Sequence, residues 1–304
     1  MLDFQIKRWD EMENSIIKMW KSKSEDLTVF SYYERKKSFI QAYKNYEYFV
    51  VYIKNNGSLI WILPIQKSKN KIEFLWTPRC DYHELIRFTD EIIDIHAVLK
   101  YLKQTFPQCI ISLSEYIYNE NINNLWSPIL LLSLDKASQY IRDKLNKYYE
   151  SKIRKMNRAK YYVDFKSINL KQEKKKFLPI LFKLHKKKWN SQGIKSQFDN
   201  IENKELYYYL IDNLPNENTQ INLLFLNWNV IAIHFWFIDK TRFYCYKDTY
   251  DIGFKKYSPW IVLTNCMVNH AIKNKCKLFD HLRGDELYKK SISNIERNNS
   301  FLSC

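Results

Sequence analysis

Glycine and proline are scarce in this sequence, with 4 Gly and 7 Pro among 304 residues. That scarcity excludes collagen-like and linker-rich architectures. Long hydrophobic runs are missing too, because the longest apolar stretches, such as residues 48–53 and 128–132, are well short of the ~18 residues that span a bilayer. The N-terminal residues bring in acidic side chains at once and have no apolar signal segment. We therefore expect a cytoplasmic protein without a membrane-spanning segment.

Cysteine is present but scattered singly, without the dense spacing of a secreted disulfide scaffold. We expect free and mostly buried thiols. Cys80 with His83, and Cys266 with His270, each resemble half of a zinc site, but neither pair has a second half. The sequence therefore predicts no metal site.

Positive charge is abundant, because 49 Lys and Arg oppose 33 Asp and Glu and leave a net charge of +16. With 46% hydrophobic and 16% aromatic residues, the chain is globular rather than disordered. The basic residues concentrate in two amphipathic helical patterns, residues 142–160 and 174–188, which are interleaved with tyrosines. A solvated lysine face is the simplest interpretation. The alternatives are contact with tRNA or another RNA, and peripheral contact with an anionic membrane.

The chain length favours two domains, and the same plan of elements occurs twice along it. The first half mixes helices with strands at residues 48–54, 58–66 and 71–76. The second half has helices, then strands at 221–228, 230–238 and 242–249, a helix at 259–273 with proline in its first turn, and a strand at 277–282. We expect an α/β (α+β) chain with domains at residues 1–135 and 136–304.

The most informative segment is residues 250–291. Its first part is a polar loop between a strand and a helix N-terminus, where free backbone N–H groups and Lys255 and Lys256 favour an anion such as a pyrophosphate. Titratable residues gather after the next strand, at 280–290, and such strand ends commonly bind ligands in α/β proteins. The structural alternative is a solvated loop with an ion pair between Arg283 and Asp285.

Two motifs in this segment resemble a known family. They are Y-D-x-x-F-x-x-Y-S-P at residues 250–259 and F-D-x-x-R-G-D-E-x-Y-K at 279–289. They are similar to the C-terminal block of GNAT-superfamily acetyltransferases of the CelD/BioF-like branch, which are relatives of the FemAB peptidyltransferases. Weaker similarity continues upstream at residues 59–65, at Asp81-Tyr82, at the basic run 152–158, and at the strand 230–237 around Ala232.

The resemblance implies tandem GNAT-like domains, each with a mixed, mostly antiparallel sheet flanked by helices, and an acyl donor bound in the second domain where two strands splay apart. The donor would be an acyl-CoA, most simply acetyl-CoA. By position, the donor-binding residues are Lys255, Lys256, Tyr257, Ser258 and Trp260. Trp260 is a departure, because the family usually has glycine there. Its side chain would meet the cofactor or pack into the core.

The implied reaction is N-acyl transfer to an amino group of a sugar or other small molecule, as in envelope or exopolysaccharide assembly. It needs a base, an oxyanion donor and an acid. The resemblance suggests Asp285 and Tyr288 as base and acid, with His234 on the strand that lines the acceptor side. Acceptor or phosphate binding is assigned to Arg283, Lys289, Asp81 and Tyr82. The alternatives are a FemAB-like transferase that uses aminoacyl-tRNA, and a non-catalytic basic module that binds RNA or anionic surfaces.

Overall fold

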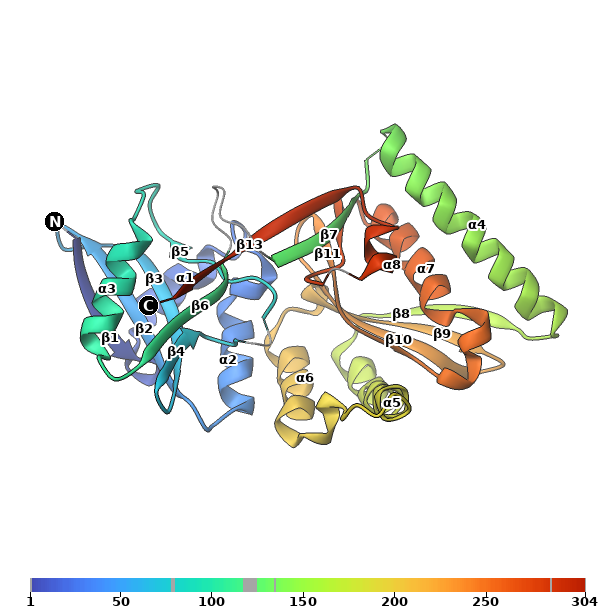
Figure 1. The fold of residues 1–304 in the computed structure, drawn as a ribbon, viewed down its shortest axis with the longest axis horizontal. Coiled ribbons are helices and arrows are strands. Elements are labelled where there is room, and N and C mark those ends of the chain that lie inside the picture. Colours follow the sequence, from blue (N-terminus) through green and yellow to red (C-terminus); the bar gives the residue numbers. More distant parts are fainter. Residues whose placement is uncertain (1, 78–79, 117–124, 134, 285, 304) are drawn as a thin grey trace. The chain divides into compact units, whose positions relative to one another are not determined.

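The computed structural model describes residues 2–77, 80–116, 125–133, 135–284 and 286–303 (Figure 1). The chain divides into two units, which we describe separately. Unit 1 comprises Met1–Leu125 and Asn298–Cys304, and unit 2 comprises Trp126–Arg297. The assignment of separate roles to domains 1–135 and 136–304 remains a prediction.

Unit 1 is built on a mixed sheet in the order β1-β2-β3-β4-β6-β13, with β5 beside β3. Neighbouring strands are antiparallel except β4 and β6, which are parallel. Its elements are β1 (Leu2–Arg8), η1 (Trp9–Glu11), α1 (Asn14–Ser22), η2 (Val29–Ser31), α2 (Tyr33–Ala42), β2 (Glu47–Asn55), β3 (Ser58–Ser68), β4 (Lys71–Phe74), β5 (Ile86–Arg87), α3 (Ile95–Thr105), β6 (Ile110–Tyr116) and the end of β13 (Ile295–Ser303).

The second unit has a mixed sheet in the order β7-β12-β11-β10-β9-β8. Strands β8 to β11 form an antiparallel meander, β12 is parallel to β11, and β7 is antiparallel to β12. Its elements are β7 (Leu125–Leu131), α4 (Lys136–Arg158), β8 (Val163–Ile168), α5 (Lys171–Asn190), η3 (Gln197–Asp199), α6 (Ile201–Asn213), η4 (Asn216–Asn218), β9 (Thr219–Leu226), β10 (Asn229–Ile238), β11 (Arg242–Tyr250), η5 (Ile252–Tyr257), α7 (Pro259–Lys273), β12 (Leu278–Asp280) and α8 (Leu287–Lys290).

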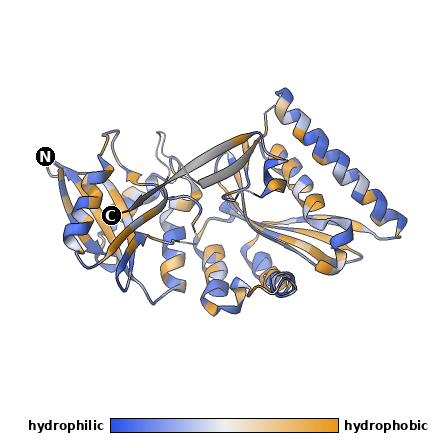
Figure 2. Cartoon of the chain, in the orientation of Figure 1, coloured by the Kyte–Doolittle hydropathy of each residue, from blue (hydrophilic) through white to orange (hydrophobic). Residues whose placement is uncertain are grey.

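Helices cover both faces of the unit 2 sheet, with α4 and α7 on one face and α5 and α6 on the other (Figure 1). The α4–α7 face holds a core in which Leu145 and Met156 of α4 meet Met267 of α7 and Trp236 of β10. Hydrophobic residues concentrate on the strands, whereas the outer surface of α4 is largely hydrophilic (Figure 2). An apolar stripe on each helix, buried against the sheet, is what fixes these layers.

The mixed α/β architecture that the sequence predicted is confirmed. Helix α7 has the expected bounds, with Pro259 at its first position, where the missing N–H of proline leaves no hydrogen bond unmade. Within the described residues, no helix combines the length and the apolarity needed to cross a bilayer.

Candidate functional site

The centre of the candidate site is the point in unit 2 where β11 and β12 part. Their parallel pairing covers three residues, from Arg242 opposite Leu278 to Tyr244 opposite Asp280. Strand β11 then continues to Tyr250 while it remains paired with β10 on its other side. A register shift between Phe235 and Phe237 marks a bulge at this level. Bulges bend a strand and re-aim its side chains, so the splay is a built feature of the sheet.

The loop that leaves β11 leads directly to the N-terminus of α7. The Asp251 carboxylate accepts a hydrogen bond from the Gly253 N–H at 2.9 Å and caps the start of η5. The residue after η5, Ser258, is in the left-handed conformation, with φ of 50°. The N–H groups of Ile261 and Val262 donate to the Ser258 carbonyl. Within the described residues this leaves the Trp260 N–H of the first turn without a partner. A helix start of this kind attracts anions.

The five residues predicted to bind a donor have different surroundings in this loop. Lys255 and Lys256 are exposed, and Ser258 forms the turn. Tyr257 is buried, with its ring 5.7 Å from that of Tyr161. Trp260 packs on the core of unit 2, and its ring centroid is 4.8 Å from that of Tyr288. The two lysines and the helix start therefore remain available to an anion, while Trp260 is held at the edge of the splay.

A cluster of titratable side chains lies around the same splay. His234 on β10 stands opposite Asp248 on β11 in the strand register. Both His234 and His281, which follows β12, are buried. Each of these imidazoles has an Nε2 atom that is buried and has no hydrogen-bond partner within the described residues. Buried polar atoms are rarely left unpaired in folded proteins, so these two atoms suggest that a ligand or water completes the site.

Neighbouring charges determine the protonation state of Asp248 in this cluster. Burial acts to raise the pKa of Asp248, but His234 and the surrounding Lys188, Lys247 and Lys289 outweigh it and lower this pKa. The Lys188 ammonium lies 4.0 Å from the Asp248 carboxylate, which is 36% exposed. Asp248 is therefore an accessible carboxylate that stays ionised at neutral pH.

The other members of the cluster stay neutral near pH 7. Burial lowers the pKa of His234 to about 4 and that of His281 to about 3. Burial, together with the negative charge of Asp248, raises the pKa of Tyr288 and that of the Cys245 thiol. Among the described residues, the site therefore combines the ionised carboxylate of Asp248 with neutral imidazoles and a protonated phenol, which is an arrangement suited to moving a proton.

The remaining predicted residues divide between the two units. Lys289 is close to the splay, donates to the Arg283 carbonyl at 2.6 Å and lies 3.0 Å from the Glu286 carboxylate. Asp285 lies outside the described residues. In unit 1, Asp81 and Tyr82 are buried, and the Tyr82 ring lies 5.3 Å from that of Phe30.

Sequence reasoning had assigned site roles to His234 and Tyr288. It gave no role to Asp248, and it placed His281 and Lys188 only within the titratable segment 280–290 and the basic run 174–188. The signal for Asp248 was a carboxylate inside an apolar strand, which is costly unless it is paired or functional. The signal for Lys188 was obscured by the run of lysines around it.

Residues 143–290 match the sequence profile of the acetyltransferase (GNAT) domain family. No curated protein matches the sequence.

Solved structures match over nearly the whole chain. FemX aligns with a TM-score of 0.60 at 9% identity, covering 98% of this chain and 96% of that one. The DUF2156 C-terminal domain of a protein named as a lysylphosphatidylglycerol synthetase, from Agrobacterium fabrum, aligns with a TM-score of 0.63 at 6% identity, covering 94% and 91%. A tandem GNAT protein from the clavulanic acid biosynthesis pathway aligns with a TM-score of 0.53 at 5% identity, covering 100% and 98%. At such low identities these matches establish the fold alone, which this chain shares with FemX and with a tandem GNAT protein.

Proposed function

We propose that this protein is an N-acyltransferase that moves an acyl group from acyl-CoA to an amine. The premise is that residues 143–290 match the acetyltransferase (GNAT) domain family. The observation that carries the proposal is the splay of β11 and β12, because the donor loop follows one of its strands and a proton-transfer cluster surrounds it. An acyl-CoA supplies a thioester, whose carbonyl carbon is open to attack by an amine. Acetyl-CoA is the simplest donor.

In this proposal the loop from Asp251 to Trp260 binds the pyrophosphate of the donor. The Trp260 N–H, which has no partner among the described residues, and the α7 dipole supply a fixed partial charge, and the exposed Lys255 and Lys256 add two cations. The Trp260 ring, packed against Tyr288, would border the path of the bound donor from the pyrophosphate to the splay. Trp260 thus takes part in binding instead of blocking it.

The proton-transfer roles follow from the charge states of the cluster. Asp248, ionised and accessible, orients the acceptor amine and accepts its proton as the new N–C bond forms. Tyr288, whose raised pKa keeps it protonated, donates to the departing thiolate as the C–S bond breaks. His234 lies behind Asp248 and is a positioning residue, because its ring is buried beside Met267. Asp285, which the sequence suggested as the base, lies outside the described residues.

The acceptor we propose is an amino group of a sugar or another small molecule in envelope or exopolysaccharide assembly. Arg283 and Lys289 would hold an anionic part of that acceptor. Asp81 and Tyr82, which the sequence resemblance also suggested for acceptor binding, are buried within unit 1. The FemX and lysylphosphatidylglycerol synthetase structures support an envelope acceptor by analogy of fold.

Acyl-CoA binding is the decisive test. We expect acetyl-CoA or a longer acyl-CoA to raise the melting temperature of the protein once its concentration exceeds its Kd. The double variant Lys255→Ala/Lys256→Ala should weaken that binding by at least about tenfold, because two phosphate contacts are lost. The matched control is Lys176→Ala/Lys195→Ala, which removes the same amount of charge elsewhere. Lys176 lies in α5, on the opposite face of the sheet from α4 and α7, and Lys195 follows that helix.

A second measurement follows release of the CoA thiol with an amino sugar as acceptor. If the Lys255/Lys256 variant and the Lys176/Lys195 control lose acyl-CoA binding equally, the loss reflects the lower net charge of the protein and not contacts made by Lys255 and Lys256. If no acyl-CoA of any chain length stabilises the protein, the proposal fails for this donor class. Stabilisation by aminoacyl-tRNA in the same assay would then assign the FemAB-like alternative, and salt-sensitive binding of uncharged RNA alone would favour the non-catalytic module.

A further inference from the structure

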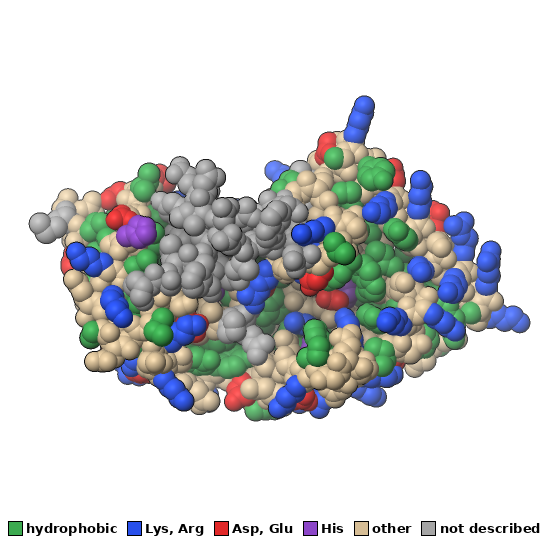
Figure 3. Space-filling view, in the orientation of Figure 1, with side chains coloured by type: hydrophobic (Ala, Val, Ile, Leu, Met, Phe, Trp, Pro, Cys, Tyr) green, Lys and Arg blue, Asp and Glu red, His purple; other side chains and the backbone are tan. Residues whose placement is uncertain are grey.

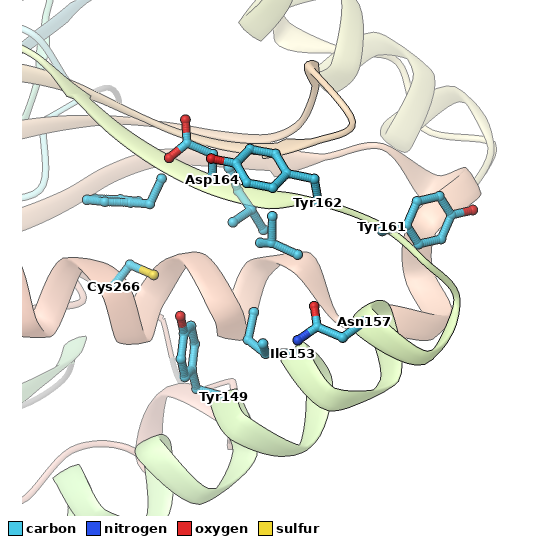
Figure 4. A pocket seen from close by; sticks show the side chains of 10 residues that line it. Tyr149, Ile153, Asn157, Tyr161, Tyr162, Asp164 and Cys266 are labelled. Carbon is cyan, nitrogen blue, oxygen red and sulfur yellow. The ribbon is translucent and has the colours of Figure 1, made fainter.

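A pocket of about 250 Å³ lies in unit 2 between α4, α7 and β8 (Figure 4). In the sheet order, β8 is separated from β12 by β11, β10 and β9, so the pocket is distinct from the splay. Tyr149 of α4 and Cys266 of α7 point toward one another across it. The lining is mostly apolar or aromatic: Tyr149, Ile153, Asn157, Tyr161, Tyr162, Val163, Asp164, Phe165, Leu224 and Cys266.

An exposed aromatic pair adjoins the pocket. Tyr162, which lines it, is 56% exposed, and Trp228 at the tip of the β9–β10 hairpin is 76% exposed. Their rings lie 5.4 Å apart, and reciprocal hydrogen bonds between Tyr162 and Asn227 tie the two segments together. A large exposed tryptophan beside a tyrosine is typical of side chains that sit at a membrane–water interface.

The backbone under Trp228 indicates that its ring is kept for a reason other than stability. Asn227 and Trp228 are the two residues of a tight hairpin turn, with φ of 46° and 69°. Such a turn favours glycine at its second position, and a bulky side chain there is strained. Strain of this kind persists mainly where a side chain has a function.

Basic side chains surround the same region. Seven Lys and Arg lie between residues 144 and 160, against the single acidic Glu150. Lysine and arginine side chains stand along α4 in the space-filling view (Figure 3). Arg154, Arg158 and Lys160 at its C-terminal end are exposed and form no ion pair within the described ranges. The one carboxylate of the pocket lining, Asp164, is 3.8 Å from Lys166 and is partly neutralised by it.

We infer that this face of unit 2 binds an anionic phospholipid bilayer. The basic side chains at the end of α4 hold the lipid phosphates, Trp228 and Tyr162 sit among the headgroups, and the pocket takes one acyl chain. Charge complementarity alone also suits RNA. A pocket lined mainly by aliphatic and aromatic residues behind the aromatic pair favours lipid, because a nucleic acid brings no aliphatic group to fill it.

Vesicle sedimentation tests the surface. The protein should bind vesicles of phosphatidylglycerol and phosphatidylcholine, bind vesicles of phosphatidylcholine alone weakly, and lose affinity as salt rises. Arg154→Glu/Arg158→Glu should lower the affinity by at least about tenfold. The matched control, Lys176→Glu/Lys195→Glu, makes the same charge change at and after α5, on the opposite face of the sheet from α4, and should retain binding.

A second experiment tests the pocket itself. Monomeric lysophosphatidylglycerol, which has one acyl chain and an anionic headgroup, should raise the melting temperature of the wild-type protein. Asn157→Phe replaces an exposed residue at the pocket with a ring that fills it, and should abolish this shift while leaving the fold intact. The inference is overturned if vesicles bind equally with and without phosphatidylglycerol, if both charge variants lose binding alike, or if RNA binds this face and lipid does not.

Discussion

At the residue scale, Asp248 is the side chain on which the proposed chemistry depends most. It is the accessible carboxylate of the cluster, and lysines together with His234 keep its pKa low. We predict that Asp248→Asn lowers kcat/KM for acyl transfer by about 10²–10⁴, the range for loss of a general base. The KM for the donor should change little, because Asp248 is not part of the loop that binds the pyrophosphate.

The control for Asp248 is Glu217→Gln, which neutralises an exposed carboxylate just before β9. Steady-state kinetics of both variants, with circular dichroism to confirm folding, separates loss of chemistry from loss of structure. Wild-type turnover in Asp248→Asn would remove Asp248 from the mechanism and leave Asp285 as the candidate base.

A second residue-scale prediction concerns stability and pH. His185 is buried, its Nδ1 lies 2.8 Å from the Ser196 hydroxyl, and burial together with Lys247 and Lys188 lowers its pKa to about 3. Its ordinary pKa is 6.5. Between these values the unfolded chain binds a proton that the folded protein does not, so stability falls as the pH drops below 6.5, by up to about 1.4 kcal/mol per pH unit.

Urea unfolding at pH 7, 6 and 5 measures this effect. His185→Gln removes the titrating group, so the free energy of unfolding of the variant should fall less steeply than that of the wild-type protein over this range. Parallel pH profiles for the two proteins would show that His185 is protonated as easily in the folded state as in the unfolded one.

At the element scale, the β9–β10 hairpin separates stability from surface binding. Trp228→Gly creates an Asn-Gly turn, which suits the positive φ of both residues. We predict that this variant unfolds at higher urea concentration, with a gain of about 1 kcal/mol, because the steric cost of a side chain in the left-handed region disappears. The same variant should bind phosphatidylglycerol vesicles more weakly.

Urea unfolding and vesicle binding of Trp228→Gly are measured together. A variant that is both more stable and weaker in lipid binding supports a ring kept for an interface. A loss of stability would mean that packing of Trp228 on Tyr162 outweighs the strain of the turn.

Elements with strong local signals were predictable from the sequence. Helix α7 was predicted to the residue, because Pro259 suits a helix start and its apolar pattern runs unbroken to Lys273. Strand β1 was missed although its residues alternate polar and apolar side chains, which is the pattern of a half-exposed edge strand. The strand predicted at residues 71–76 ends at Phe74, because Trp76 adopts a positive φ of 88°. Local patterns do not encode such tertiary constraints.

The location of the candidate site was predictable from the sequence, but the full set of residues that form it was not. The donor loop and the residues after β12 are contiguous in sequence, so a motif could identify them. Asp248 joins His234 only through the pairing of β10 with β11, and Lys188 reaches the cluster from α5. Contacts between segments far apart along the chain require the folded topology.

At the scale of the whole molecule, the chain leaves unit 1 at residue 125 and returns to it at residue 298. The returning residues belong to β13, whose backbone pairs with β6 from Ser300 opposite Tyr116 to Ser303 opposite Ser112. The last strand of unit 1 is thus supplied only after all of unit 2 has been made. Completion of the unit 1 sheet therefore depends on a long-range contact, which is slow to form in folding.

Deletion of residues 298–304 tests this dependence. We predict that the loss of the β6–β13 hydrogen bonds destabilises unit 1 by roughly 2–4 kcal/mol, at about 1 kcal/mol for each bond. It also exposes β6 as an open sheet edge, which favours aggregation. Hydrogen exchange monitored by mass spectrometry provides the readout, with amides of β4 and β6 expected to exchange faster and those of α7 serving as the internal control. Faster exchange in α7 as well would contradict the prediction. It would mean that the two units unfold cooperatively, because removal of a strand from unit 1 would then also destabilise unit 2.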